Sequence, residues 1–173
     1  MNKKHIALFS AAMMFSTSVF CQNWYIDGGA GFVNFDDGVD EISPTNLYLR
    51  GGYRFNPYFS IGLESSVTVS PDQLPSVPDV DLSVSAVTFF LRGGVPVGES
   101  VLIYGQIGRT NTELTAEYQG LEISEDDNDT SLGFGAEIDI GNSPAYVALN
   151  YTLYNNNDGV DVTGLNIGVG ARF

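Results

Sequence analysis

The sequence contains very little cysteine, histidine or lysine. Its 173 residues include 1 Cys, 1 His and 7 Lys plus Arg, against 21 Asp plus Glu, so the formal net charge is −14. A single cysteine excludes a disulfide-rich scaffold and a Cys-rich metal site. The shortage of basic residues argues against binding a nucleic-acid backbone, which requires clustered Lys and Arg. No nucleic-acid partner is therefore expected.

The first residues have the pattern of a secretory signal peptide. Lys3 and Lys4 precede residues 6–20, which are apolar or small and carry no charge. A positively charged region followed by a short apolar region is typical of such a peptide. The run is too short for a membrane-spanning helix, which needs about 20 residues. We predict that residues 1–21 are a cleaved signal peptide and that residues 22–173 form one domain.

Cleavage after Cys21 is the favoured site, although a site a few residues earlier remains open. Val19 and Cys21 then occupy the two positions that must be small. The alternative is a lipoprotein with an acylated Cys21. Lipoprotein signals usually place a small residue directly before the cysteine, whereas this chain has Phe20.

Loss of the first 21 residues would restrict the chemistry of the domain. His5, Cys21 and both lysines would be lost, which leaves five arginines as the basic residues. The domain could not then build a Ser-His-Asp triad, a cysteine nucleophile or a histidine-based zinc site. Glu137 and Asp139 lie on one face of one predicted strand, as a pair of catalytic carboxylates could. Ion pairing with arginines predicted to point into the same interior explains their position better than catalysis does. We expect no enzymatic activity, no cofactor and no metal site.

The remaining sequence indicates an all-β domain. Apolar and small polar residues alternate with a period of two, and no stretch has a convincing helical period. The predicted strands are Trp24–Val33, Asn46–Phe55, Tyr58–Val69, Leu82–Val95, Val101–Leu114, Thr130–Ile140, Ala145–Tyr154 and Asp161–Phe173.

The connections between these strands alternate in length. Residues 56–57, 96–100 and 141–144 form short connections that are rich in Gly, Pro, Asn or Ser. The other connections are mostly longer and polar, namely residues 34–45, 70–81, 115–129 and 155–160. Short connections at one end and longer ones at the other predict an eight-stranded antiparallel up-and-down transmembrane β-barrel.

The composition of the polar faces distinguishes two kinds of barrel. A soluble lipocalin-like carrier would point its apolar faces inward and its polar faces to water, and a membrane barrel does the reverse. A water-facing surface should be dense in Lys, Glu and Asp, but here the polar faces are mostly Gly, Ser, Asn and Tyr. Small residues suit the narrow interior of eight strands. The membrane barrel is therefore favoured.

Aromatic residues gather near the predicted strand ends, as in the interfacial girdles of membrane barrels. They are Trp24, Tyr53, Phe55, Phe59 and Phe173 at one end, and Phe32, Tyr151 and Tyr154 toward the other.

Three segments carry a resemblance to a known family. Residues 23–32 (NWYIDGGAGF), 49–55 (LRGGYRF) and 165–173 (LNIGVGARF) resemble strands of OmpA-like and OmpX-like small outer-membrane β-barrel proteins. The resemblance implies an integral outer-membrane protein of a Gram-negative bacterium, with both termini in the periplasm.

The same resemblance implies partners. They are outer-membrane lipid and lipopolysaccharide, and the barrel-assembly machinery during biogenesis; the barrel is expected to be a monomer. In this family a terminal Phe with alternating apolar residues before it is the signal for that machinery. The matching positions here are Phe173, Ala171, Val169, Ile167 and Leu165.

Charged residues are predicted inside the barrel. Alternation directs four acids and four arginines inward, and their formal charges cancel. These residues are Asp27, Arg50, Arg54, Glu64, Arg92, Glu137, Asp139 and Arg172. Charges in a narrow barrel must be paired or hydrated. The set is either a salt-bridged plug that fixes strand register or a polar path for water or small ions.

Sixteen of the 21 acids lie in the longer connections or the adjoining strand ends. The richest segment carries Glu113, Glu117, Glu122, Glu125, Asp126, Asp127 and Asp129. These acids form either a solvated surface or a weak divalent-cation site, for example one that bridges to lipopolysaccharide phosphates.

The sequence as a whole predicts a structural or cell-surface interaction role, with acidic extracellular loops displayed on a side-chain-filled barrel. A narrow pore for water or small ions and a soluble periplasmic lipocalin-like carrier are the alternatives. The sequence does not identify an extracellular partner.

Overall fold

The computed structural model describes residues 23–36, 41–73, 80–118, 121–157 and 160–173. The predicted signal peptide, residues 1–21, lies outside this part of the chain. Eight long strands dominate the fold. They are β1 (Trp24–Asp36), β3 (Thr45–Arg54), β4 (Phe59–Ser70), β6 (Val80–Val97), β7 (Val101–Tyr118), β8 (Leu121–Asp139), β9 (Ala145–Asn157) and β10 (Val160–Arg172). Two short strands, β2 (Glu41–Ile42) and β5 (Asp72–Gln73), pair with β1 and β6. No helix in the described part is long and apolar enough to cross a membrane.

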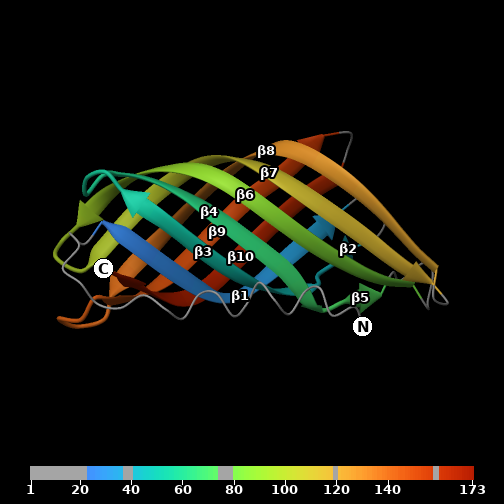
Figure 1. The fold of residues 1–173 in the computed structure, drawn as a ribbon, viewed down its shortest axis with the longest axis horizontal. Coiled ribbons are helices and arrows are strands. Elements are labelled where there is room, and N and C mark those ends of the chain that lie inside the picture. Colours follow the sequence, from blue (N-terminus) through green and yellow to red (C-terminus); the bar gives the residue numbers. More distant parts are fainter. Residues whose placement is uncertain (1–22, 37–40, 74–79, 119–120, 158–159) are drawn as a thin grey trace.

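The eight long strands form a closed antiparallel barrel (Figure 1). Each strand pairs with its neighbours in chain order, and β1 pairs with β10 from Tyr25 opposite Arg172 to Asp36 opposite Asp161. Closure leaves neither the first nor the last strand with an open edge along this length. The predicted eight-stranded up-and-down barrel is confirmed.

The short connections lie at the end of the barrel that carries the C-terminus (Figure 1). Between β3 and β4, the Asn56 Oδ1 accepts hydrogen bonds from the backbone N–H groups of Tyr58 at 2.8 Å and Phe59 at 2.9 Å. Gly98 and Gly141 lie in the β6–β7 and β8–β9 turns with φ of 67° and 59°, which glycine adopts without a steric penalty.

The prediction of a long acidic loop at residues 115–129 was wrong. β7 continues to Tyr118, β8 begins at Leu121, and the two strands pair along their whole length. Similarly, β9 continues to Asn157 and β10 begins at Val160, within the predicted loop 155–160. Acidic residues suggest a loop, but cross-strand pairing satisfies the backbone groups of these strands, while the side chains of Glu125, Asp126 and Asp127 are exposed to water. The charges therefore do not prevent an extended conformation.

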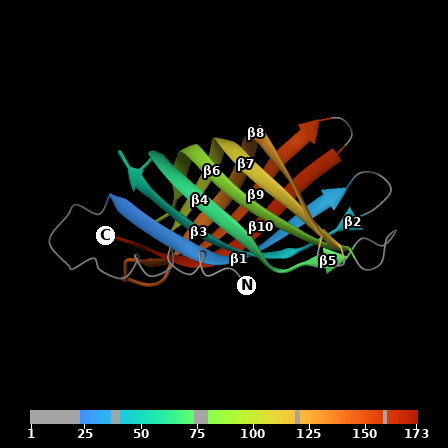
Figure 2. The ribbon, with the colours of Figure 1, turned by 45° about the vertical axis from the view of Figure 1, so that its right-hand side comes forward.

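β7 and β8 continue beyond the end of the β8–β9 pairing, and β6 pairs with β7 over the same stretch, while the other edge of β6 pairs with β4 and β5. β8 pairs with β9 only from Leu132 to Asp139, whereas it pairs with β7 up to Leu121. We call the paired residues 80–90, 108–118 and 121–131 the sheet extension; its base, which includes Thr88, Thr110 and Ser131, still lines the lumen. Figure 2 shows this end of β7 and β8 diverging from the ends of β9 and β10.

The apolar faces of the strands point outward. Large apolar side chains on the outside are about half exposed, for example Leu63 at 57%, Phe134 at 64% and Val169 at 64%. The side chains that alternate with them are buried inside. The soluble-carrier alternative is therefore wrong, because its interior would be apolar and its exterior polar. Tyr154, predicted near an aromatic girdle, instead lies buried in the barrel and donates a hydrogen bond to Glu64.

Glycines make room for the tyrosines inside. A Cβ added to Gly135 would lie 2.5 Å from the Tyr104 hydroxyl, and one added to Gly170 would lie 2.5 Å from the Tyr146 ring. Such distances are far inside van der Waals contact, so these tyrosines pack directly against bare backbone. The mixture of Gly and Tyr on the polar faces is thus a packing pattern of the lumen.

Candidate functional site

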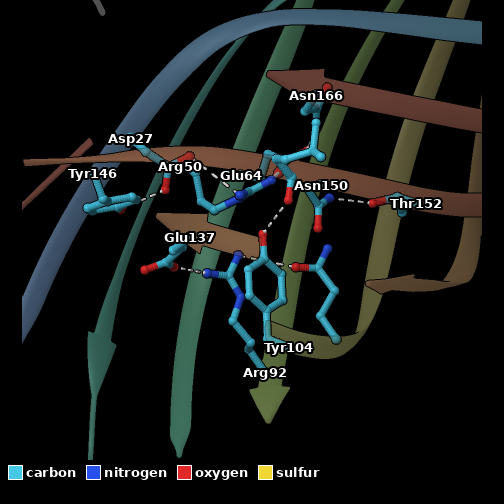
Figure 3. A network of polar contacts seen from close by, with 12 residues as sticks. Asp27, Arg50, Glu64, Arg92, Tyr104, Glu137, Tyr146, Asn150, Thr152 and Asn166 are labelled. Atoms are coloured by element: carbon cyan, nitrogen blue, oxygen red, sulfur yellow. Dashed lines mark hydrogen bonds and ion pairs between the residues drawn. The ribbon is translucent and has the colours of Figure 1, made fainter. Parts of the chain in front are cut away.

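The first group of luminal charges centres on Arg50, which is fully buried on β3 (Figure 3). Its Nε lies 2.8 Å from Oε2 of Glu64 on β4, and its Nη1 lies 3.4 Å from Oδ1 of Asp27 on β1. Glu64 also accepts a hydrogen bond from the Asn166 amide at 3.2 Å, and Asp27 accepts one from the Tyr146 hydroxyl at 3.1 Å. Each carboxylate therefore has a cation and a neutral donor, which offsets the cost of its burial.

The second group centres on Glu137 of β8, which is also fully buried. Its carboxylate forms ion pairs with Arg92 at 2.8 Å, with Arg172 at 2.8 Å and with Arg54. Arg172 also lies 2.5 Å from Asp139. Arg54, Arg172 and Asp139 remain partly exposed, near the end of the barrel that carries the short turns. In this second group three arginines pair with two acids. In the first group one arginine, Arg50, pairs with two acids.

Aromatic and neutral polar side chains complete the filling of the lumen. The Arg92 guanidinium lies 3.8 Å from the centre of the Tyr104 ring, and the Arg172 guanidinium lies 4.6 Å from that of Tyr146. This spacing is within the range of cation–π attraction. Thr110 lies 2.9 Å from both Thr88 and Ser131 and links β6, β7 and β8 by hydroxyl contacts.

The structure places all eight predicted charged residues in the lumen, and each makes at least one ion pair. Sequence reasoning had no partner assignments. It also did not single out the neutral donors Tyr146, Tyr154 and Asn166, although alternation put Tyr146 and Asn166 on inward faces. No local sequence pattern indicates these contacts, because the partners are far apart in the chain: Tyr146 and Asp27 are separated by 119 residues.

The five predicted assembly-signal residues lie on or directly after β10. Leu165, Ile167 and Val169 expose their side chains on the outer face, and Ala171 is partly exposed. Phe173 is anchored by backbone hydrogen bonds to Trp24 at 3.0 Å and 2.9 Å. The last residue is thereby held beside the first strand, where the barrel closes.

The acids of the sheet extension lie apart from the luminal charges. Glu113, Glu125, Asp126 and Asp127 are exposed, and Asp129 is partly exposed. The Arg109 guanidinium donates to Asn128 Oδ1 at 2.7 Å and to its carbonyl oxygen at 3.2 Å. In the described part of the chain, no group of three His, Cys, Asp or Glu residues has the arrangement to hold a metal ion.

Comparisons with solved structures agree with this architecture. Neisserial surface protein A superposes with a TM-score of 0.68 at 12% identity, covering 87% of this chain and 97% of its own. Ail, the attachment invasion locus protein of Yersinia pestis, solved with the heparin analogue sucrose octasulfate, gives 0.67 at 17% identity, covering 87% and 98%. The outer membrane protein OprG of Pseudomonas aeruginosa gives 0.60 at 16% identity, covering 87% and 95%. At these identities the likeness establishes the fold alone.

The amino-acid sequence itself identifies the family. Among curated proteins, none matches it. It does match the family model of the outer membrane protein β-barrel domain over residues 6–173, nearly the whole chain. This match agrees with the closed barrel, the outward apolar faces and the polar lumen described above. The chain belongs to the outer-membrane β-barrel protein family and is a bacterial outer-membrane protein.

Proposed function

We propose that this protein is a cell-surface interaction protein, in which a closed barrel anchors an acidic sheet extension outside the cell. The observation that carries the proposal is the pairing of β6, β7 and β8 beyond the last β8–β9 pair, Leu132 with Leu153. Continuous cross-strand hydrogen bonds make this extension a stiff platform rather than a set of independent loops. In this class of barrel the end opposite the short turns faces the outside.

The filled lumen supports a structural role for the barrel itself. Arg50 and Glu137 are fully buried and ion-paired across several strands, so they couple distant parts of the sheet. Eight-stranded barrels have interiors that side chains just fill. The luminal charge network thus acts as a plug that holds strand register, and the extension carries the interaction.

The charge of the extension favours a cationic partner. Four exposed acids lie on the extension. The register places Glu113 and Asp126 on the same face as Arg109, whose guanidinium is bonded to Asn128, and places Glu125 and Asp127 on the opposite face. Ail was solved with a sulfated, anionic ligand. Such a ligand would be repelled by the extension of this chain, so we expect the partner class to differ from that of Ail.

The test uses the full-length mature protein in nanodiscs of zwitterionic phosphatidylcholine, with a fluorescent lysine-rich peptide as the probe. We expect binding that weakens with added salt, since surface charges are screened. A variant carrying Glu113→Gln, Glu125→Gln, Asp126→Asn and Asp127→Asn should bind about tenfold more weakly, the product of several small surface contributions. Glu99→Gln, in the β6–β7 turn at the opposite end, is the control and should bind like the wild type. Equal binding by wild type and the fourfold variant would contradict the proposal.

We also propose partners for the assembly of the barrel in the outer membrane. The terminal strand, with Phe173 held against Trp24, is the segment we propose the barrel-assembly machinery recognises. Outer-membrane phospholipid and lipopolysaccharide then surround a monomeric barrel. Deleting Phe173 should lower the amount of folded protein in the outer membrane without changing the amount synthesised.

A further inference from the structure

The outer face of the barrel carries a shallow, widely open hollow of about 630 Å³ with a floor of glycine. Gly93 on β6 lies opposite Gly105 on β7, Phe59 on β4 lies opposite Gly93, and Phe134 on β8 lies opposite Gly105. One row across four strands therefore reads Phe, Gly, Gly, Phe. The two rings are 60% and 64% exposed, so they stand up as walls on either side of bare backbone.

Apolar side chains lie on the other two sides. Val95 and Ile103, which lie opposite each other, line the hollow on the side toward the turns, and Leu91 and Ile107 form the next outward-facing pair on the side toward the sheet extension. All four are at least half exposed and point away from the lumen. The hollow is thus an apolar notch two strands wide, with strands about 5 Å apart.

Packing inside the protein does not explain these two glycines. A Cβ on Gly93 would lie 3.6 Å from the nearest atom, of Phe59, and a Cβ on Gly105 would lie 3.8 Å from its nearest atom, the Gly133 carbonyl oxygen. Both are ordinary contact distances, unlike the 2.5 Å at the luminal Gly135. Glycine within a strand weakens it and often marks a place where another molecule approaches closely. The space that Gly93 and Gly105 leave open lies on the membrane side.

We propose that this notch is a binding site for one acyl chain of a phospholipid in the periplasmic leaflet. It lies on the lipid-facing side of an outer-membrane barrel, near the short turns, which face the periplasm in this class. None of its lining residues is charged, so it suits hydrocarbon and not a headgroup. An unfilled notch would lose dispersion contacts on its floor and walls. A chain lying in it touches protein on several sides, while a chain elsewhere on the barrel touches one.

The proposal is tested by photocrosslinking the wild-type protein in vesicles of phosphatidylethanolamine and phosphatidylglycerol. A small fraction of the lipid carries a diazirine in one acyl chain, and peptide mass spectrometry maps the adducts. Phe134 is compared with Val169, which is equally exposed, at 64%, on β10. We expect about threefold more adduct at the notch, because packing alone distinguishes one lipid contact from another in a bilayer.

Filling the notch provides the decisive comparison. The Gly93→Leu/Gly105→Leu double variant should bring the adduct ratio of Phe134 to Val169 down to about one. Gly51→Leu is the matched control, since Gly51 also faces outward with comparable room but stands between Ile26 and Leu63. Heat-modifiable gel mobility verifies that both variants fold.

Two results would overturn the acyl-chain site. One is wild-type labelling in which the ratio of Phe134 to Val169 is the same as in the double variant. The other is protein-to-protein crosslinking at the notch together with a dimer mass in native mass spectrometry, because a second copy of the chain would then be the occupant. Retention of one phospholipid by the wild type, and its loss in the double variant, would support the proposal independently.

Discussion

Arg50 and Glu64 lie directly opposite each other on β3 and β4, and the Arg50 Nε donates to Glu64 Oε2 across 2.8 Å. Both side chains are shielded from water, so water cannot solvate either charge in place of its partner. This one ion pair therefore both fixes the register of β3 against β4 and neutralises the two buried charges. A shift of one residue between the two strands would turn one of these charges outward into lipid and leave the other unpaired in the lumen.

Removing one member of this pair should be more harmful than removing both. Arg50→Met leaves two buried carboxylates without their cation and should lower the free energy of unfolding by about 3–5 kcal/mol. The Arg50→Met/Glu64→Leu variant should recover a large part of that loss, because only Asp27 then loses a cation. Urea unfolding of the protein in lipid vesicles, followed by gel mobility, measures both. If the double variant is as unstable as the two single losses added together, the two residues are not coupled.

The tyrosine-on-glycine packing gives a prediction with an internal control. Gly135→Ala places a methyl group 2.3 Å from the Leu149 carbonyl oxygen and 2.5 Å from the Tyr104 hydroxyl, so it should destabilise the barrel by about 1–3 kcal/mol. Gly51→Ala, on the outer face with 3.8 Å to its nearest atom, should change stability little. The same unfolding assay compares them. Similar stability of the two variants would show that the lumen is less tightly packed than described.

Because side chains fill the lumen, we expect the protein not to conduct ions. Planar lipid bilayers containing the wild-type protein should show no discrete conductance steps, because Arg92, Tyr104 and Glu137 occupy the cross-section of the barrel. Steps that diminish when Arg50 or Glu64 is substituted would instead establish the alternative of a narrow pore for water or small ions. Such a result would also show that the luminal ion pairs exchange partners.

The predicted signal peptide can be tested by the mass of the mature protein. Cleavage after Cys21 predicts a chain that begins at Gln22 and contains no lysine, histidine or cysteine. Intact-mass measurement of protein extracted from outer membranes gives the result. A mass that includes Cys21 and two or three acyl groups would establish the lipoprotein alternative, and a start before Gln22 would move the cleavage site.

The barrel could be predicted from sequence because strand alternation is a local property. Leu47 and Leu49 alternate with Tyr48 and Arg50, and the small, weakly charged composition of the inward faces separates a membrane barrel from a soluble one. The prediction of a loop at residues 115–129 was wrong for the same reason: it relied on a local property, the acidic composition of the segment, which is typical of loops. Their strand conformation is stabilised by pairing between β7 and β8, and from β7 to β6, rather than by their own propensity.

What the sequence by itself determined is therefore the membrane class, the number of long strands and the side of each strand on which a charge lies. Tertiary structure alone decided which charges meet. Arg54 and Glu137 are 83 residues apart, and they form an ion pair because closure of the barrel and the stagger of its strands bring them across the lumen. The notch between Phe59 and Phe134 was decided in the same way, by the register of four strands. Register arises from the sum of all cross-strand pairs, so no single segment of the chain contains it.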